Sequence, residues 1–416
     1  MSHIILQGGA RLEGTLPVQG AKNSVLPILA ASILHPGRTV LQGCPHLSDV
    51  EASIRILRHL GCRADWEGGD LVVDASGIDR WDIPDHLMRE MRSSVVFLGS
   101  ILARMGRAEM SHPGGCELGP RPIDLHLAVL RQLGAGIREE GGCLRCTAQR
   151  LEGREITLSM PSVGATENAI LAACGAYGET VLLNAAREPE IGDLQDFLCA
   201  MGCQVKGAGS STICIQGRSP TRDARYTVMP DRIVAATYLA AAAAAGGEVE
   251  LTQVHPGHLS TVTAALHAAG CQIYSGEGRI VLRSEGRLRS IGTVRTAPYP
   301  GFPTDAQAIL MAALLRGQGS TVFVENIFEN RYRHVDELCR MGADIRVADR
   351  VAVVTGVPCL CGASVRCTDL RGGAALLVAG AAAQGETRIG DIFHIQRGYQ
   401  DPVGDLRQLG ARIETG

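Results

Sequence analysis

Residues 49–75, DVEASIRILRHLGCRADWEGGDLVVDA, contain the pattern that recurs along this chain. Apolar residues follow helical spacing as far as Leu60, Gly61 comes next, and the residues after it alternate as in a pair of strands. A glycine in this place is typical of a helix C-cap, where the backbone needs a positive φ. The stretch therefore predicts a helix that ends at a glycine and leads into two strands.

Six copies of this ending occur in the 416 residues: LGCRA (60–64), LGAGI (133–137), MGCQV (201–205), AGCQI (269–273), MGADI (341–345) and LGARI (409–413). A more apolar helical stretch and then a Gly-led strand, such as GETVLLN (178–184), come before each amphipathic helix. Each unit is expected to be β-α-β-α-β-β. The period is too long for an ordinary solenoid repeat, so we expect two globular domains of three units each.

The two ends of the chain look like parts of one unit. Strands are expected at residues 3–7 and near 11–19, and the last copy stops before its strand pair is complete. The N-terminal strands are therefore expected to complete the final unit, which would bring both termini into one domain.

Composition excludes several classes of protein. The net charge of −3 argues against non-specific nucleic-acid binding. MSHIILQGGARLEG (1–14) lacks the pattern of a secretory signal, and YLAAAAAAGG (238–247) is too short to span a bilayer. The 14 cysteines are scattered, which favours reduced thiols in a cytoplasmic protein. CLRC (143–146) reads as a strand without further ligands at metal spacing, so no metal is expected.

Cations stand near the starts of many predicted helices, where they oppose the helix dipole. Three begin apolar helices, and three come just ahead of amphipathic ones: Lys22, Arg92 and Arg371, then Arg121, Arg331 and Arg397. Each could be a solvated surface cation. Taken together with exposed helix N–H groups, they predict a site for a multiply charged anion. If the helix starts of both domains face one another, this anion lies in the cleft between them.

Cys116 and Asp305 are the candidate reactive residues. Cys116 lies in HPGGCELGPRP (112–122), where glycines allow loop movement and Arg121 would lower the thiol pKa. A functional thiol is favoured over a buried inert one, and residues 112–121 are expected to close over the cleft. A redox sensor paired with Cys143 or Cys146 is a weaker alternative. Asp305 is either a helix N-cap or a general base, and spacing does not decide between them.

Nine long motifs resemble the UDP-N-acetylglucosamine enolpyruvyl transferases: AKNSVLPILAA (21–31), RSSVVFLG (92–99), HPGGCELGPRPIDLH (112–126), SVGATEN (162–168), AAREPEI (185–191), RTAPYPGFPTDAQA (295–308), ENIFENRYRHVDEL (325–338), DLRGGAALLVAG (369–380) and HIQRGYQD (394–401). The resemblance implies an inside-out α/β barrel architecture with two similar domains. Their implied bounds are residues 22–229, and residues 1–21 plus 230–416, with the active site in the cleft between them.

The resemblance also implies the chemistry. The enolpyruvyl group of phosphoenolpyruvate passes to the 3′-hydroxyl of UDP-N-acetylglucosamine through a tetrahedral phospholactoyl intermediate, and phosphate is released. This is the first committed step of bacterial peptidoglycan synthesis, and neither metal nor organic cofactor is expected. Cys116 matches the general acid, which fosfomycin alkylates, and Asp305 matches the base.

The remaining roles are carried over from the family. Lys22, Arg121 and Arg397 match the contacts of phosphoenolpyruvate, with Arg92, Arg331 and Arg371 nearby or assisting closure. Asp369 matches a carboxylate near the reacting carbons, and Asn23 a residue that touches the ligand. The residues implied for the nucleotide sugar are Arg92, Arg121, Pro122, Ile123, Asp124, Leu125, Ser162, Val163, Gly164, Asp305 and Ile327. An apolar residue after a strand, such as Ile327, is more often part of a core.

Two other functions fit parts of the pattern. A catalytically silent paralogue could bind the nucleotide sugar as a regulator, although the complete set of reactive residues argues against it. A shikimate-pathway enolpyruvyl transferase shares the architecture but lacks the HPGGC loop. A monomer or weak homo-oligomer is expected.

Overall fold

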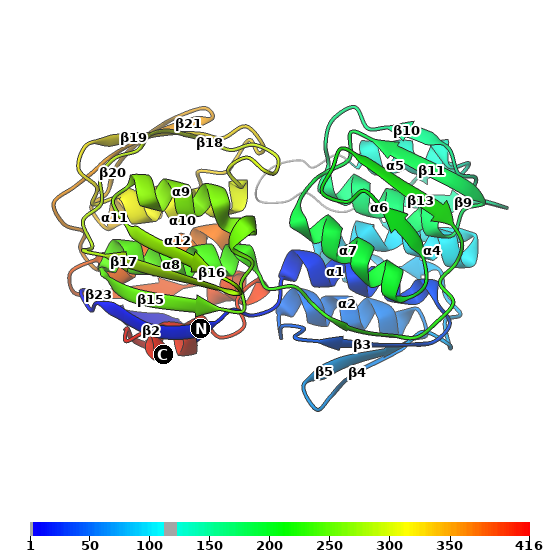
Figure 1. Ribbon diagram of the computed structural model, residues 1–416, viewed down its shortest axis with the longest axis horizontal. Coiled ribbons are helices and arrows are strands. Elements are labelled where there is room, and N and C mark those ends of the chain that lie inside the picture. Colours follow the sequence, from blue (N-terminus) through cyan, green and yellow to red (C-terminus); the bar gives the residue numbers. More distant parts are fainter. Residues whose placement is uncertain (1–2, 112–122) are drawn as a thin grey trace. The chain divides into compact units, whose positions relative to one another are not determined.

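The computed structural model describes residues 3–111 and 123–416. Contacts divide the chain into two compact units. The first, here called the terminal unit, comprises residues 1–19 and 230–416, and the second, the central unit, comprises the described residues from 20 to 229. Each unit is built from three four-stranded sheets and the helices packed on them (Figure 1).

All six sheets share one pattern of pairing: the first two strands are parallel, and the third and fourth are added antiparallel. The central unit contains the sheets β14 (Ala224–Thr227), β3 (Arg38–Gln42), β5 (Asp70–Asp74), β4 (Arg63–Glu67); β6 (Asp82–Ile83), β7 (Arg107–Ser111), β9 (Cys143–Thr147), β8 (Gly136–Glu140); and β10 (Glu155–Thr157), β11 (Gly178–Leu183), β13 (Thr212–Gly217), β12 (Gln204–Lys206).

The terminal unit repeats this pattern and joins the two ends of the chain. Its sheets are β2 (Leu12–Pro17), β15 (Gly247–Thr252), β17 (Arg279–Ser284), β16 (Gln272–Gly276); β18 (Gly292–Arg295), β19 (Ser320–Val324), β21 (Val351–Thr355), β20 (Asp344–Ala348); and β22 (Ser364–Arg366), β23 (Glu386–Gly390), β1 (Ile4–Gln7), β24 (Arg412–Thr415). β1 lies between β23 and β24, so the expectation that the N-terminal strands complete the final unit is confirmed for β1. It is wrong for β2, which pairs with β15 in another sheet.

Two strands, β2 and β14, each belong to a sheet of one unit although the helix that follows them in the chain belongs to the other. β2 comes just before helix α1 in the chain, yet it pairs with β15, with Leu12 opposite Gly247. β14 comes just before helix α8, yet it pairs with β3, with Ala224 opposite Thr39. Each exchanged strand belongs to the same compact unit as the sheet that it completes. The chain therefore passes from one unit to the other after each of these strands.

Apolar helices form the interior of each unit. They are α1 (Lys22–Ala31), α4 (Phe97–Met105) and α6 (Val163–Cys174) in the central unit, and α8 (Arg232–Ala245), α10 (Thr304–Leu314) and α12 (Leu370–Ala382) in the terminal unit. The last three contact one another in pairs and are buried along almost their whole length. Helices that are apolar on all sides must lie inside, so the sheets cover them. The predicted α/β class is confirmed.

The second set of helices is amphipathic and more exposed. They are α2 (Ser48–His59), α5 (Asp124–Gln132), α7 (Pro189–Ala200), α9 (Ser260–Ala268), α11 (Val335–Arg340) and α13 (Pro402–Gln408). Shorter pieces are α3 (Asp85–Glu90) and the 3-10 turns η1 (Ser32–Leu34), η2 (Arg92–Val96), η3 (Pro256–Leu259) and η4 (Ile392–Arg397). The apolar helix predicted from Arg92 onward is thus divided into η2 and α4.

The repeated glycine ends each amphipathic helix in the predicted conformation, with φ between 90° and 110° in all six copies. In the first copy Gly61 N–H donates to Arg58 O at 3.1 Å, and Cys62 N–H donates to Leu57 O at 3.0 Å. These two bonds define a Schellman cap, in which the residue after the glycine packs back onto the helix. Cys62, Cys203 and Cys271 occupy this small buried position, so three of the cysteines have a structural role.

The caps should be essential to stability. Gly134 has a φ of 100° and space for a Cβ, so Gly134→Ala should cost the central unit about 1–2 kcal/mol of unfolding free energy through backbone strain. Gly61→Ala should cost more, because its Cβ would lie 2.5 Å from Gly77 O. Both tryptophans, Trp66 and Trp81, lie in the central unit, so urea unfolding followed by tryptophan fluorescence reports on it.

Gly192→Ala is the matched control. Gly192 lies inside α7 with open space around it, and alanine favours a helix over glycine by about 1 kcal/mol. This variant should unfold at the same or a slightly higher urea concentration. A Gly134→Ala protein as stable as the wild type would show that the cap conformation carries no strain.

Candidate active site

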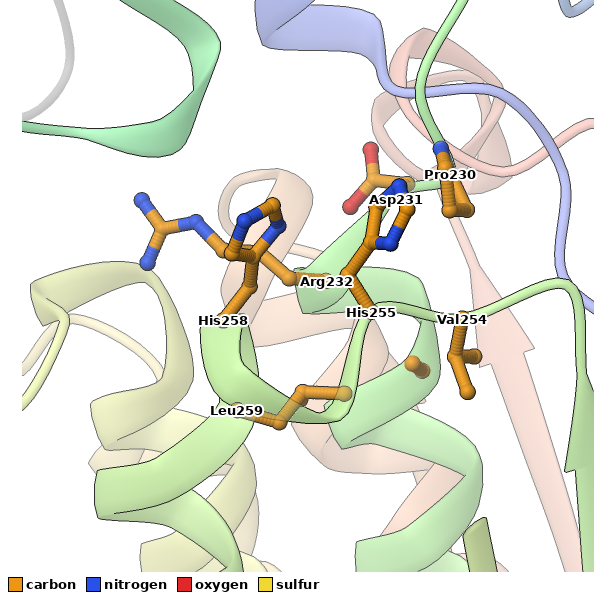
Figure 2. A pocket seen from close by; sticks show the side chains of 8 residues that line it. Pro230, Asp231, Arg232, Val254, His255, His258 and Leu259 are labelled. Carbon is orange, nitrogen blue, oxygen red and sulfur yellow. The ribbon is translucent and has the colours of Figure 1, made fainter. Parts of the chain in front are cut away.

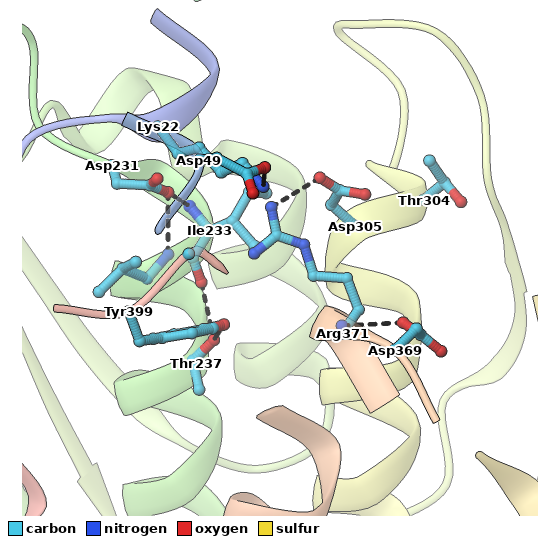
Figure 3. Close-up of polar contacts among 12 residues, drawn as sticks. Lys22, Asp49, Asp231, Ile233, Thr237, Thr304, Asp305, Asp369, Arg371 and Tyr399 are labelled. Atoms are coloured by element: carbon cyan, nitrogen blue, oxygen red, sulfur yellow. Dashed lines mark hydrogen bonds and ion pairs between the residues drawn. The ribbon is translucent and has the colours of Figure 1, made fainter. Parts of the chain in front are cut away.

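A carboxylate held by two buried guanidinium groups is the main feature of the terminal unit. Asp305 is the second residue of α10, and its Oδ1 lies 2.8 Å from Arg331 Nη2. Its Oδ2 lies 2.8 Å from Arg371 Nη2 (Figure 3). The arginine side chains are 3% and 5% exposed, and that of Asp305 is 26% exposed. These arginines are therefore not solvated surface cations.

Asp305 does not cap its helix. The residue before α10 is Pro303, and no side chain provides a cap bond there. The N-cap alternative from the sequence is therefore wrong. The side chain of Asp305 is 26% exposed, so a bound hydroxyl can reach its carboxylate.

Asp369 is the N-cap of α12. Its Oδ1 accepts hydrogen bonds from the backbone N–H groups of Arg371 at 2.9 Å and Gly372 at 3.1 Å. Burial acts to raise the pKa of Asp369, but the charge of Arg331 and these backbone bonds together outweigh this effect. The pKa therefore lies below its usual value. Asp369 is thus a buried carboxylate that fixes the start of the helix carrying Arg371.

Other polar groups surround Arg371. Burial acts to lower the pKa of its guanidinium, but the charge of Asp305, with a smaller effect from Asp231, raises it above the usual value. Tyr399 shares a 2.7 Å hydrogen bond with Thr237, and Asp231 Oδ1 caps α8 through Ile233 N–H at 2.8 Å. Arg397 ends η4 and is half-buried. Ion pairs and hydrogen bonds thus link Asp305, Arg331, Arg371 and Asp369 within the terminal unit. Figure 3 shows the contacts of Arg371 with Asp305 and Asp369.

Lys22 begins α1 in the central unit, and its Nζ lies 2.6 Å from Asp49 Oδ2 of α2. Both side chains are less than a tenth exposed. Asn23, the next residue, is half-buried. Lys22 is therefore also a buried, paired cation and not a solvated one.

The starts of α5 and α6 meet in the central unit. Ile123 is buried, Asp124 is exposed and Leu125 is half-buried, while Ser162 caps α6 by accepting a bond from Ala165 N–H at 3.4 Å. A Cβ on Gly164 would lie 2.8 Å from His126 Cε1, so glycine is needed where the two helix starts touch. The predicted segments 123–125 and 162–164, which includes Val163, are thus brought together.

His126 is a buried histidine at this contact. Asn168 Nδ2 donates to His126 Nδ1 at 2.8 Å, so this ring nitrogen is an acceptor. Burial lowers the pKa of His126 to about 4, and Asp124 opposes this shift. His126 is therefore neutral at physiological pH and belongs to the packing of the two helices.

Several predicted residues fall outside what the structure describes. Cys116, Arg121 and Pro122 lie outside the described residues, as does the predicted loop closure. Arg92 begins η2, but its side chain is not among those described. Ile327 is 37% exposed, so the alternative that it belongs to a core is wrong.

The described residues contain neither a candidate metal site nor a candidate membrane span. CLRC lies in β9 as predicted, and no group of residues able to hold a metal is found in 3–111 or 123–416. Across the same ranges no helix is both long and apolar enough to cross a membrane.

A small hollow in the terminal unit lies apart from the residues that the sequence singled out. It is lined at the start of α8 by Pro230, Asp231, Arg232 and Ala235, and on the facing segment by Val254, His255, His258 and Leu259 (Figure 2). The two histidine rings lie 5.0 Å apart. Asp305, Arg331 and Arg371 do not line it.

Sequence reasoning missed Asp49, Asp231, Glu325, His334 and Tyr399. Asp49 and Asp231 look like ordinary helix-start acids in the sequence. Glu325 could have been noticed, because a charged residue directly follows the apolar run at the end of GSTVFVE (319–325). No local signal indicates His334, which is buried between Asp369 and Arg331 and whose pKa is lowered to about 4, chiefly by burial.

Comparisons with solved structures define the class of fold. The enolpyruvyl transferase NikO from Streptomyces tendae superposes with a TM-score of 0.89 at 28% sequence identity, covering 100% of this chain and 99% of that one. EPSP synthase from Acinetobacter baumannii gives a TM-score of 0.73 at 21% identity, with the same coverage, and shows the fold alone. A family model described as EPSP synthase (3-phosphoshikimate 1-carboxyvinyltransferase) matches residues 6–406. The fold is that of the enolpyruvyl transferases.

Curated relatives narrow this class. A UDP-N-acetylglucosamine 1-carboxyvinyltransferase 2 from Caldanaerobacter subterraneus subsp. tengcongensis is 48% identical over 413 residues, 99% of each chain. A UDP-N-acetylglucosamine 1-carboxyvinyltransferase from Dichelobacter nodosus is 45% identical over 415 residues, 100% of this chain and 99% of that one. The chain belongs to the family of UDP-N-acetylglucosamine 1-carboxyvinyltransferases. These matches give no support to the silent or shikimate-pathway alternatives.

Removing the shared carboxylate should destabilise the terminal unit. Asp305→Ala leaves two buried guanidinium groups without their partner, and we expect a loss of about 2–4 kcal/mol, somewhat less than for a fully buried pair because Asp305 is partly exposed. Asp305→Asn retains one acceptor and should lose less. Scanning calorimetry checks this order, with Asp336→Ala on exposed α11 as the control. Equal melting temperatures for Asp305→Ala and the control would contradict the ion-pair account.

Acid should weaken the central unit through His126. Its folded pKa of about 4 lies below the unfolded value of about 6.5, so the unfolded chain binds a proton that the folded chain does not. The contribution is present above pH 6.5 and is lost as the pH falls towards 4, by on the order of 3 kcal/mol.

Urea unfolding followed by tryptophan fluorescence from pH 4 to 7 measures this loss. His126→Gln should flatten the profile in that window, whereas His86→Gln, at an exposed position of the same unit, should leave it unchanged. The same slope in His126→Gln and wild type would assign the acid sensitivity to other groups.

Proposed function

We propose that this protein transfers the enolpyruvyl group of phosphoenolpyruvate to the 3′-hydroxyl of UDP-N-acetylglucosamine and releases phosphate. The observation that carries the proposal is the pair of buried guanidiniums, Arg331 and Arg371, that hold Asp305 at the start of α10. The names of the full-length relatives supply the substrate class. The proposed place of this reaction is the first committed step of peptidoglycan synthesis.

Phosphoenolpyruvate carries a carboxylate and a phosphate, so its binding requires several cations. Lys22, Arg121 and Arg397 are proposed to contact it, while Arg92, Arg331 and Arg371 assist. Arginine suits this task because its planar fork pairs with carboxylate and phosphate through two parallel bonds. Arg331 and Arg371 are already buried and held in place, so little side-chain entropy is lost when an anion joins them.

The reaction needs one acid and one base in its first step. Cys116 is proposed to give a proton to the methylene carbon of phosphoenolpyruvate, while the 3′-oxygen bonds to the neighbouring carbon. Asp305 is proposed to take the hydroxyl proton. The tetrahedral intermediate then loses phosphate and a proton from the new methyl group, which restores the alkene. Asp369 is proposed to lie near these carbons, and Asn23 to contact the ligand.

The nucleotide sugar is proposed to bind mainly through the starts of two helices in the central unit. Residues 123–125 and 162–164 meet at His126, and this contact brings backbone N–H groups of α5 and α6 near one another. Helix N-termini favour anions such as a diphosphate. Arg92, Arg121, Pro122, Asp305 and Ile327 complete the proposed set. We further propose a cytoplasmic location and a monomer or weak homo-oligomer.

Release of inorganic phosphate from the two substrates at pH 6–8 tests the proposal. Wild-type protein should release phosphate only when both substrates are present. Asp305→Asn and Cys116→Ala should each lower kcat about 100-fold or more, because each removes a proton-transfer group. Asp336→Asn, an exposed carboxylate of the same unit, serves as the matched control and should be fully active.

Failure has two recognisable forms. No phosphate release by the wild type, together with calorimetric binding of UDP-N-acetylglucosamine, would favour a silent binding protein. Full activity of Asp305→Asn would support the transfer reaction but would contradict the role of Asp305 as its base.

A further inference from the structure

Glu325 is a buried carboxylate that the transfer chemistry above does not use. It directly follows β19 and is 0% exposed. Its Oε1 accepts hydrogen bonds from Ile327 N–H at 2.8 Å and Phe328 N–H at 3.0 Å. Its Oε2 accepts the hydroxyl of Thr304 at 3.0 Å. One side chain thus joins the segment after β19 to the first residue of α10.

A second bond closes this connection into a ring. Arg331, at the other end of the segment, donates from Nη2 to Thr304 O at 3.1 Å and to Asp305 Oδ1 at 2.8 Å. Thr304 is therefore held by its hydroxyl through Glu325 and by its carbonyl through Arg331. The position of Asp305, the next residue, depends on both ends of segment 325–331.

The rest of the segment is anchored independently of Glu325. Asn326 N–H donates to Thr296 Oγ1 at 2.9 Å, and Asn326 Nδ2 donates to Thr296 O at 3.0 Å. Glu325 forms no ion pair with another described residue, so hydrogen bonds alone hold its two carboxyl oxygens. Burying a carboxylate in this way is costly, and an apolar residue would fill the same space without that cost.

We propose that Glu325 and Thr304 are a positioning pair, which fixes Asp305 relative to the exposed Ile327 segment so that the base meets the sugar hydroxyl at reacting distance. This inference rests on the proposed function, because it assigns both groups to one substrate. Displacements of about 1 Å can cost about 100-fold in rate. The pair would act on kcat through Asp305 without touching the substrate itself.

The test is a double-mutant cycle on kcat for phosphate release. Thr304→Val retains the shape but loses the hydroxyl, and Glu325→Leu retains the approximate size but loses both acceptor oxygens. Each should lower kcat about 10- to 100-fold, and the double variant should be no worse than Glu325→Leu alone, because that change already removes the bond to Thr304. Thr304→Ser should restore kcat to within about threefold of wild type.

Thr387→Val is the matched control in the same unit, because Thr387 is fully buried and its hydroxyl has no partner among the described residues. It should keep wild-type activity. A Thr304→Val enzyme within twofold of wild type, or equal losses in Thr304→Ser and Thr304→Val, would overturn the proposal.

A measurement without turnover separates this proposal from the proposed function. Amide hydrogen exchange at Ile327 and Phe328 in the ligand-free protein should be at least threefold faster in Thr304→Val, and unchanged in Thr387→Val. If the wild type transfers nothing, the proposed function fails, but the exchange rates still test whether Thr304 and Glu325 hold the segment in place. Unchanged exchange in Thr304→Val would overturn the proposed positioning pair.

Discussion

The terminal unit depends on the ion pairs between Asp305 and the buried guanidinium groups of Arg331 and Arg371. Two guanidiniums this close would repel one another and would be costly to bury alone. Asp305 between them and Asp369 nearby balance their two charges, so the cluster can fold before any substrate arrives. At the start of α1, the buried charge of Lys22 is likewise balanced by its ion pair with Asp49.

The repeat explains how such groups come to lie at helix starts. Each β-α-β-α-β-β repeat places an apolar helix inside and ends its amphipathic helix with a glycine cap. The polar residues of the buried helices therefore lie at the helix ends. Asp231, Thr304 with Asp305, and Asp369 with Arg371 open α8, α10 and α12, which contact one another. A buried helix offers a polar residue few other positions, because its sides face apolar neighbours.

Local features of this fold could be predicted from the sequence, and distant ones could not. The six glycine caps and the β1 strand followed from periodicity and backbone conformation, which are properties of short segments. The exchange of β2 and β14 did not, because alternation reveals a strand but not its partner. The carboxylate partners of Lys22, Arg331 and Arg371 were also missed, since they are 26 residues or more away in sequence. The roles of Cys116 and Arg121 remain predictions.

We propose that the preformed, buried guanidiniums of Arg331 and Arg371 assist the binding of the anionic substrate. The most direct measurement is the KM for phosphoenolpyruvate of Arg371→Lys at saturating UDP-N-acetylglucosamine. Lysine keeps the charge but loses the planar fork, so the KM for phosphoenolpyruvate should rise about tenfold, and that for the nucleotide sugar should change less than about threefold. An unchanged KM for phosphoenolpyruvate would contradict the claim.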